Sequence, residues 1–332
     1  MKFIKKIGLL VGAMAISFSA MSEEISIGYQ GAFNPYKQVI DEKMLEKQLG
    51  VSIKWRRFDS GAKAMTALAS GSLDITAAGS SPISAAVSNG VKAELFWILE
   101  NIGDAEALVV RDGSDIMKPS DLKGKTLAVP FVSTTHFHMM FALEQFGLKP
   151  KDVRLLNMQP SAISASWRRG DIDAAFIWDP VLSEIKKTGH VLVTSKTLSA
   201  WGKPTFDGLV ANKKFSETHK EFLVDLVKII ASVDKKYNDN KSSFTSENPI
   251  AKSISKVTGG DLNSVPAVMA LYEYPPLADQ VSCAWLGCGG KGGAVSALKA
   301  TSEFLLDQKK ISDLKEDYSV FVNPEYAEAA MK

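Results

Sequence analysis

Two segments of this chain, about a hundred residues apart, repeat one pattern, and this repeat constrains the fold more than any other feature. In residues 69–82 and again in residues 168–180, a glycine ends a helix-like run and a short apolar strand follows. A proline then opens the next helix, with Ser81 or Asp179 as its predicted cap. Strands that alternate with helices of this length form mainly parallel sheets. The repeat therefore predicts two similar α/β lobes rather than one continuous sheet.

The 332 residues suffice for two domains, and two strand-like runs mark the predicted boundary between them. These runs, residues 107–111 and 208–212, are interpreted as strands that connect the lobes and serve as the hinge. The first lobe then comprises residues 23–108 and residues 212–332, which include a series of C-terminal helices. The second lobe comprises residues 109–211 together with the connecting strands.

Residues 1–22 are predicted to form a cleavable signal peptide. Lys2, Lys5 and Lys6 precede an apolar run from residue 7 to residue 18, which is too short to span a bilayer and is typical of a signal core. Small residues follow, and Glu23 is the predicted start of the mature chain. The protein is therefore expected in the periplasm.

The net charge and the cysteine content limit the classes of partner and cofactor that we expect for this protein. The net charge of +2 and the lack of a basic stripe with interleaved aromatic residues argue against nucleic acid. Cys283 and Cys288 lie five positions apart, which is typical of a loop disulfide in an oxidising compartment. A metal site needs more ligands than two thiols, and the four histidines do not supply them, so we expect no metal and no cofactor.

A turn with three consecutive hydroxyls, Ser133, Thr134 and Thr135, lies between an apolar run and a helix-like run that begins at Phe137. The start of a helix leaves about four backbone N–H groups without intrahelical partners, and the helix dipole there favours an anion. The turn carries no side-chain charge unless His136 is protonated, so it suits an anion held by hydrogen bonds. The alternative is that Ser133 or Thr134 only caps its own helix.

Polar residues follow other predicted strands as well. In open α/β sheets, ligands bind beyond the carboxyl ends of the strands, so these residues from both lobes are expected to meet in a cleft. Their donors are neutral, which suits a permanently ionised oxyanion such as a sulfonate. Besides the turn at residues 133–135, the predicted contributors are Gln30, Asp59, Ser60, Ser80 and Ser81.

Acidic and aromatic residues form a second predicted set near the lobe boundary: Asp104, Glu106, Asp179, Asp207, Trp178 and Trp201. Carboxylates and aromatic faces suit an ammonium ion through charge-assisted hydrogen bonds and cation–π contacts. The alternatives are structural, with Asp179 as a helix cap, Asp104 as a solvated side chain and Trp178 in the core. An unpaired buried carboxylate is costly, so Glu106 and Asp207 are open to either a structural or a ligand-binding role. Both sets together suit a small zwitterion.

Eight stretches of this sequence carry a resemblance to a known family: residues 55–61, 79–82, 106–110, 129–136, 159–160, 170–180 and 201–205, and Asp207. They are similar to the corresponding motifs of the periplasmic taurine-binding proteins of ABC importers, within the wider nitrate, sulfonate and taurine group of substrate-binding proteins. The resemblance covers nearly the whole mature chain. The loop at residues 283–293 departs from it, because the loop is larger than the helix connection expected there.

The resemblance implies a two-lobed periplasmic-binding-protein fold of type II, which closes on taurine (2-aminoethanesulfonate) and delivers it to an ABC permease and its ATPase. The protein is expected to act as a monomer. The implied sulfonate contacts are Ser80, Ser81, Ser133, Thr134 and Thr135. The amine would meet Glu106 and Asp207, and Trp178 and Trp201 would pack on the ethyl linker. Gln30, Asp59 and Ser60 are second-choice contacts.

Three alternatives stay open. The ligand could be an aliphatic sulfonate without an amine, in which case Glu106 and Asp207 would be structural. An enzyme on the same scaffold is the second alternative, and His136 beside Ser133 is its candidate dyad, without an evident carboxylate partner. An adhesin or sensor ectodomain is the third, although no transmembrane helix or repeat array in the sequence favours it.

Overall fold

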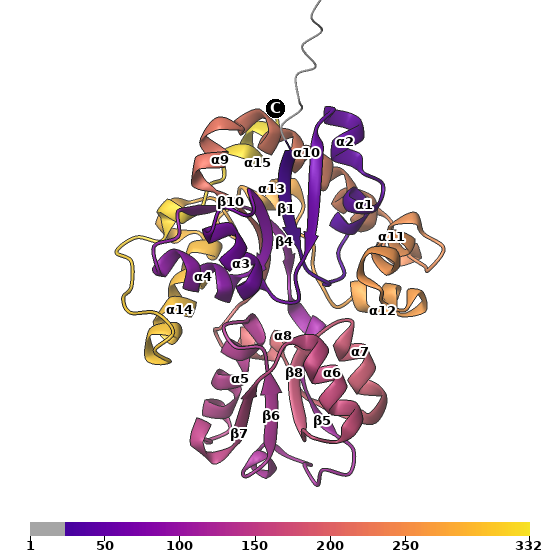
Figure 1. Cartoon of the computed structure of the whole chain (residues 1–332), viewed down its shortest axis with the longest axis vertical. Helices are drawn as coiled ribbons and strands as arrows, with labels where there is room; N and C mark the ends of the chain where they lie inside the picture. Colours follow the sequence, from indigo (N-terminus) through magenta and orange to yellow (C-terminus); the bar gives the residue numbers. More distant parts are fainter. Residues whose placement is uncertain (1–23) are drawn as a thin grey trace, which may run out of the picture.

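Two separate five-stranded sheets, each covered by helices, form the two lobes of the molecule (Figure 1). The computed structural model describes residues 24–332, so the predicted signal peptide and Glu23 lie outside the described residues. In the first sheet the strand order is β2 (Ser52–Arg57), β1 (Glu24–Tyr29), β3 (Ile75–Gly79), β10 (Phe206–Asn212) and β4 (Ala93–Asn101). In the second sheet it is β7 (Arg154–Asn157), β6 (Thr126–Val129), β8 (Ala174–Trp178), β5 (Glu106–Arg111) and β9 (Gly189–Thr194).

The two sheets share one topology. In the first, β1 runs parallel to β2 and β3, and β10 runs antiparallel to β3 and β4. In the second, β6 runs parallel to β7 and β8, and β5 runs antiparallel to β8 and β9. The strands of the sequence repeat, β3 and β8, hold the same place in each sheet and are buried along their whole length. The two-lobed α/β fold expected from the repeat is confirmed.

Helices cover both faces of each sheet, which explains the continuous apolar runs of the central strands. On the first sheet, α1 (Tyr36–Asp41), α2 (Met44–Leu49), α10 (Lys220–Asp239) and α15 (Glu325–Ala330) pack on one face, and α3 (Gly61–Ala69), α4 (Ser80–Ser88) and α14 (Gly293–Asp307) on the other. On the second, α5 (Thr134–Gln145) and α8 (Ser195–Ala200) lie opposite α6 (Pro160–Arg169) and α7 (Val181–Ile185). The remaining helices are α9 (Lys213–Thr218), α11 (Pro249–Thr258), α12 (Val265–Met269) and α13 (Leu277–Gln280).

The strands expected to connect the lobes do not do so. β5 pairs only with strands of the second sheet, and β10 pairs only with strands of the first. The chain crosses between the sheets at residues 102–105 and again at residues 195–205, which contain α8. The expectation was wrong because a strand in the core of a lobe and a strand that connects two lobes have the same apolar sequence pattern. We propose that the lobe boundaries fall in these two segments.

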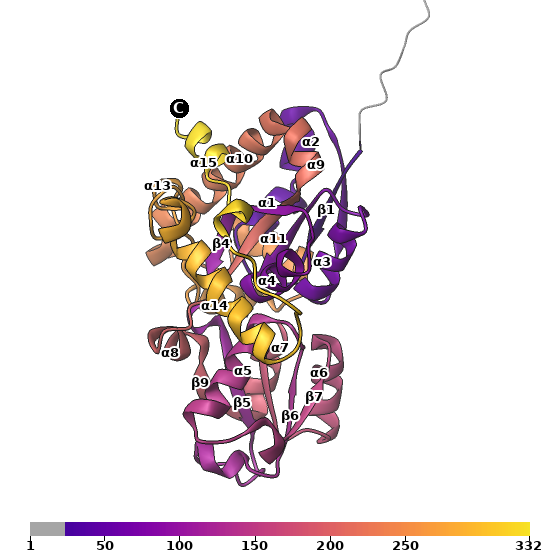
Figure 2. The ribbon, with the colours of Figure 1, turned by 90° about the vertical axis from the view of Figure 1, so that its left-hand side faces the viewer.

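Helix α14 makes a third link between the lobes (Figure 2). Near its C-terminal end, the ring of Phe304 lies 4.9 Å from the ring of Phe137 and 5.9 Å from that of His136, both on α5. Just beyond it, the Lys310 ammonium lies 5.0 Å from the ring centre of Phe131. The C-terminal arm therefore packs directly on the second lobe.

The loop before α14 holds a disulfide between Cys283 and Cys288. Beside them in this loop, Leu286 and Trp285 pack into the apolar core of the first lobe. Among the described residues, no helix combines the length and apolarity that crossing a membrane requires.

Candidate functional site

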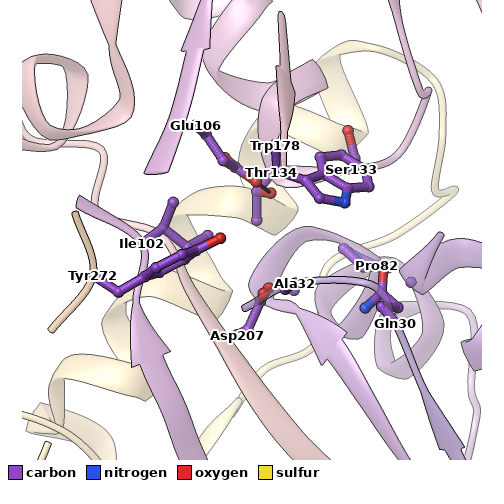
Figure 3. A pocket seen from close by; sticks show the side chains of 12 residues that line it. Gln30, Ala32, Pro82, Ile102, Glu106, Ser133, Thr134, Trp178, Asp207 and Tyr272 are labelled. Atoms are coloured by element: carbon purple, nitrogen blue, oxygen red, sulfur yellow. Dashed lines mark hydrogen bonds between the residues drawn. The ribbon is translucent and has the colours of Figure 1, made fainter. Parts of the chain in front are cut away.

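A small cavity lies between the two lobes (Figure 3). Its walls come from both sheets, from the first crossing and from the C-terminal region. The lining residues are Gln30, Ala32, Gly61, Gly79, Pro82 and Asp207 of the first lobe, Ile102 of the crossing, Glu106, Ser133, Thr134 and Trp178 of the second lobe, and Tyr272. The carboxyl ends of the parallel strands therefore meet at one cavity, as expected for an open α/β sheet.

On the first lobe, β3 ends at Gly79 and α4 begins at Ser80, so the N-terminus of α4 lies at the cavity. Ser81 was predicted as the cap of this helix, but it lies within its first turn, and Gly79 occupies the cap position. A Cβ atom at Gly79 would lie 2.9 Å from Cγ2 of Thr134 and 3.0 Å from Oδ1 of Asp207. Glycine at this position therefore allows the two lobes to approach each other.

Three serine hydroxyls near this wall have no hydrogen-bond partner within residues 24–332: those of Ser60, Ser80 and Ser81. All three side chains are buried. A buried hydroxyl without a partner costs about 1–3 kcal/mol, and backbone N–H groups at a helix start also lack intrahelical partners. These unpartnered hydroxyls lie beside the cavity, at the starts of α3 and α4.

The hydroxyls of the turn at residues 133–135 make different hydrogen bonds from those that the sequence suggested. Ser133 caps α5, because its Oγ accepts from the backbone N–H of His136 at 3.0 Å, and its hydroxyl donates to the Pro130 carbonyl at 2.5 Å. Thr135 lies 2.7 Å from Ser133 through their hydroxyl oxygens, and it does not line the cavity. The capping alternative is therefore confirmed for Ser133, and the backbone N–H groups of Thr134 and Thr135 are the donors this turn offers.

Glu106 lies at the start of β5, with only 4% of its surface exposed. The Thr134 hydroxyl donates to its Oε1 at 2.5 Å, and its Oε2 lies 3.2 Å from Oγ of Ser195. Burial, reinforced by the nearby charge of Asp207, raises the pKa of Glu106 to about 8. Near neutral pH a large fraction of this carboxyl is therefore uncharged in the free protein.

Asp207 faces Glu106 from the other lobe and belongs to a buried polar cluster with Glu100, Lys37 and Asn34. Asp207 and Glu100 pair across β10 and β4 and share a hydrogen bond. Asn34 donates to both carboxylate oxygens of Glu100 at 3.1 Å and accepts from Lys37 at 3.0 Å. Burial raises the pKa of Asp207 to about 6 and lowers the pKa of Lys37 to about 8. The cluster fixes Asp207 at the floor of the cavity.

Two aromatic side chains complete the walls. Trp178 ends β8 and is 9% exposed, and the hydroxyl of Tyr272 points into the cavity (Figure 3). Burial and the surrounding carboxylates raise the pKa of Tyr272 well above its ordinary value. Tyr272 reaches the site because the neighbouring residue, Glu273, forms a β-bridge with Asn101 at the end of β4.

Six of the predicted contacts do not line the cavity: Asp59, Ser60, Ser80, Ser81, Thr135 and Trp201. Asp59 is half exposed and lies 3.7 Å from the Lys63 ammonium. Trp201 is 48% exposed and ends α8 on the outside of the second crossing. Its position in a loop after two small residues suggested the cleft, but the backbone of α8 directs this end of the helix to solvent.

Asp179 and His136 occupy structural positions. Asp179 was predicted as the cap of α7, but Pro180 occupies the cap position, and Asp179 accepts from the backbone N–H of Ser183 at 3.1 Å. Nδ1 of His136 accepts from the backbone N–H of Val132, and its ring stacks on Phe131. Burial and the Lys310 charge lower the pKa of His136 to about 4. His136 and Ser133 therefore do not form a nucleophile–base pair.

Sequence reasoning missed six lining residues: Ala32, Gly61, Gly79, Pro82, Ile102 and Tyr272. The motif at residues 79–82 contains two of them, but only its serines were predicted as contacts. The glycines could have been found from the need for close approach at the end of a strand. Tyr272 had no such signal, because a pairing between distant segments brings it to the site.

Three comparisons place this chain among known proteins. The model of the NMT1-like family matches residues 19–247. The taurine-binding periplasmic protein of Escherichia coli K12 is 35% identical over 320 residues, which cover 96% of this chain and 98% of that protein. A putative aliphatic sulfonates-binding protein of Bacillus subtilis is 30% identical over 213 residues, 62% of this chain and 63% of that protein.

The fold is similar to that of a solved alkanesulfonate-binding protein from Xanthomonas axonopodis, bound to MOPS. The TM-score is 0.72 at 22% sequence identity, and the match covers 90% of this chain and 96% of that one. At this identity the likeness concerns the arrangement of the two lobes.

Proposed function

This chain belongs to the NMT1-like family, and from that premise we propose that it captures taurine between its lobes and delivers it to an ABC importer. The observation that carries the proposal is the composition of the cavity. Two carboxyl groups, Glu106 and Asp207, share it with the starts of two helices, α4 and α5. None of the described residues that line it is lysine or arginine. Such a site suits a ligand that carries both charges itself.

The sulfonate is proposed to bind at the N-terminus of α4. The unpartnered hydroxyls of Ser80 and Ser81 lie there, and Ser60 lies at the start of the neighbouring α3. Helix N-termini favour anions through their free N–H groups and their dipole. A sulfonate offers three acceptor oxygens and no proton, so it can satisfy these donors without competing for a proton. Gln30 and the N–H groups of Thr134 and Thr135 are further proposed donors.

The amine is proposed to bind between Glu106 and Asp207. These carboxyl groups come from opposite lobes, so one ammonium bound to both ties the lobes together. Hydrogen bonds between an ammonium and a carboxylate are charge-assisted and contribute about 1.5–3 kcal/mol. The faces of Trp178 and Tyr272 can add cation–π attraction and cover the ethyl linker.

Binding then drives closure rather than chemistry. The ligand contacts residues of both sheets, so it stabilises the closed arrangement over the open one. The chain crosses between the lobes only at residues 102–105 and 195–205 within the described part, and these segments can absorb the rotation. We propose that the closed monomer, in the periplasm, is the form that the permease and its associated ATPase recognise.

Calorimetric titration of the mature protein with taurine and with ethanesulfonate tests the proposal. Taurine should bind at least about tenfold more tightly, because ethanesulfonate leaves both carboxyl groups without the ammonium. Asp207→Asn should remove most of this preference, and Asp59→Asn, outside the cavity, should leave it unchanged. Equal affinity for the two ligands would instead support the alternative of an amine-free aliphatic sulfonate, which the name of the Bacillus subtilis relative suggests.

An enzyme on this scaffold is the remaining alternative, since a fold does not fix a function. Prolonged incubation of the protein with taurine, followed by assays for sulfite and for recovered taurine, decides between the two. We expect full recovery of taurine, and stoichiometric sulfite above the level of a buffer control would contradict the proposal.

A further inference from the structure

A chain of hydrogen bonds runs from Glu106 to the second crossing between the lobes. Oε2 of Glu106 lies 3.2 Å from Oγ of Ser195, and this Oγ lies 2.7 Å from Nδ1 of His138. The other ring nitrogen of His138, Nε2, lies 2.7 Å from the carbonyl oxygen of Lys203. His138 and Ser195 are fully buried, and neither residue lines the cavity.

The number of protons in this chain follows from its geometry. A carbonyl oxygen only accepts, so Nε2 of His138 carries a proton. In a neutral imidazole Nδ1 then accepts, and it takes the single hydroxyl proton of Ser195. Ser195 then has no proton left to donate to Oε2 of Glu106, so with a neutral His138 their 3.2 Å contact is a hydrogen bond only if the carboxyl group carries the proton. The other arrangement, a charged His138 beside an ionised Glu106, contains the same number of protons.

Electrostatics decide where this extra proton lies. Burial lowers the pKa of His138 to about 4, whereas the pKa of Glu106 is raised to about 8. The proton therefore belongs to Glu106 near neutral pH, and His138 is neutral.

We propose that Ser195 and His138 are positioning residues that hold a proton on Glu106 in the free protein, and that an ammonium ligand displaces this proton on binding. The inference rests on the proposed capture of an amine-bearing sulfonate. The carboxylic acid ionises, its proton leaves to solvent, and the resulting carboxylate accepts a hydrogen bond from the ammonium. The free cavity thus avoids two facing carboxylates, and full charge develops only when a cation is present to balance it.

The groups around Glu106 favour this arrangement. Asp207 faces it from β10 with Glu100 and Lys37 behind, and Tyr272 faces it from the C-terminal region. Asp104, on the crossing that leads into β5, is paired with Lys196 of α8 at 3.4 Å. Within the described residues, none of the ion pairs includes Glu106, so burial and Asp207 act on it without a compensating cation.

Calorimetry of taurine binding in buffers of different ionisation enthalpy measures the displaced proton. Below the pKa of Glu106, about one proton should be released per taurine bound, and the affinity should fall about tenfold for each unit of decreasing pH. Ethanesulfonate, which has no ammonium, should release none. Binding of taurine with no proton release across this range would overturn the inference and leave the proposed function intact.

Glu106→Gln imitates the protonated side chain. Its amide oxygen can accept from Thr134, and its NH₂ group can donate to Ser195, so the variant should fold as stably as the natural protein. It should release no proton and bind taurine no better than ethanesulfonate. Potentiometric titration of the two free proteins provides a test that needs no ligand, because only the natural protein should take up an additional proton near pH 8. An additional uptake centred at the ordinary glutamate value of 4.5 would refute the inference even if taurine does not bind.

His138→Phe tests the positioning role. Without Nδ1 as an acceptor, the hydroxyl proton of Ser195 becomes available to the carboxylate of Glu106, which stabilises its ionised form. The pH range of proton release should therefore shift downwards, and an unchanged range would show that His138 is merely structural. His136→Phe, the same substitution two positions earlier on α5 and outside the hydrogen-bond chain, is the matched control. If His138→Phe does not fold, the Glu106→Gln titration still decides the proton count.

Discussion

The hydroxyl of Thr134 donates a hydrogen bond of 2.5 Å to Oε1 of Glu106. The two side chains were expected at opposite ends of a bound zwitterion, but the structure makes them partners. Thr134 begins α5 and Glu106 begins β5, so this bond joins the start of a helix to an acidic group on the adjacent strand. The unpartnered serine hydroxyls beside the cavity therefore belong to the first lobe, to Ser60, Ser80 and Ser81.

Thr134→Val should weaken taurine binding about tenfold near neutral pH. The substitution preserves the shape of the side chain but removes the donor to Glu106, which makes the ionised carboxylate less stable by about 1–2 kcal/mol. Titration calorimetry measures the effect. Thr135→Val is the matched control, because this neighbour contacts Ser133 and does not line the cavity. Equal losses in both variants would indicate a general disturbance of α5 rather than the bond to Glu106.

Gly79→Ala should abolish measurable ligand binding while leaving the protein folded. The added methyl group would lie 2.9 Å from Thr134 of the opposite lobe and 3.0 Å from Asp207, which prevents the lobes from closing. The open form relieves the contact with Thr134, so the thermal stability of the free protein should change little. Gly290→Ala is the control, because a Cβ there meets no atom within 4 Å. Small-angle scattering with and without taurine should show compaction for the control alone.

The free protein should lose stability as pH rises from about 5 to about 8. The folded-state pKa of Glu106 lies near 8, above its ordinary value of 4.5. The folded state then binds the proton more tightly than the unfolded state, and this contribution is lost as pH increases through the folded-state value. Urea unfolding at several pH values measures the slope. Glu106→Gln should reduce the slope without removing it, since Asp207 contributes in the same direction.

Phe304→Ala should open the molecule and lower its stability by about 1–2 kcal/mol. The ring packs on His136 and Phe137 of the second lobe, and its loss removes apolar area and two aromatic contacts. Scattering from the free variant should give a larger radius of gyration, and taurine affinity should fall because more of the protein starts open. Val320→Ala, on the exposed surface, should change neither quantity. An unchanged radius for Phe304→Ala would show that α14 does not restrain the lobes.

Much of the architecture could be predicted from the sequence, because it depends on local signals. The glycines that end α3 and α6, the buried strands β3 and β8 and the order of helices and strands are all visible in the repeat. The lobe crossings could not be predicted in detail, since β5 and β10 have the same apolar pattern whether they lie inside a lobe or between lobes.

Some residues of the candidate site could also be predicted from the sequence, and others could not. Gln30, Ser133, Thr134 and Glu106 follow or begin predicted elements, and the structure brings them to one cavity. Tyr272 depends on the bridge between Asn101 and Glu273, about 170 residues apart in the sequence, and no local pattern encodes it. Trp201 was misplaced because its direction depends on where α8 ends, which the composition of a loop does not reveal.

The position of β10 between β3 and β4 also limits the order in which the two sheets can be completed during synthesis. β4 has no neighbouring strand in its sheet except β10, and the whole second sheet is encoded between these two strands. During synthesis from the N-terminus, all strands of the second sheet are made before β10, the neighbouring strand of β4. The first sheet, to which β1 belongs, can therefore be completed only after every strand of the second sheet has been synthesised.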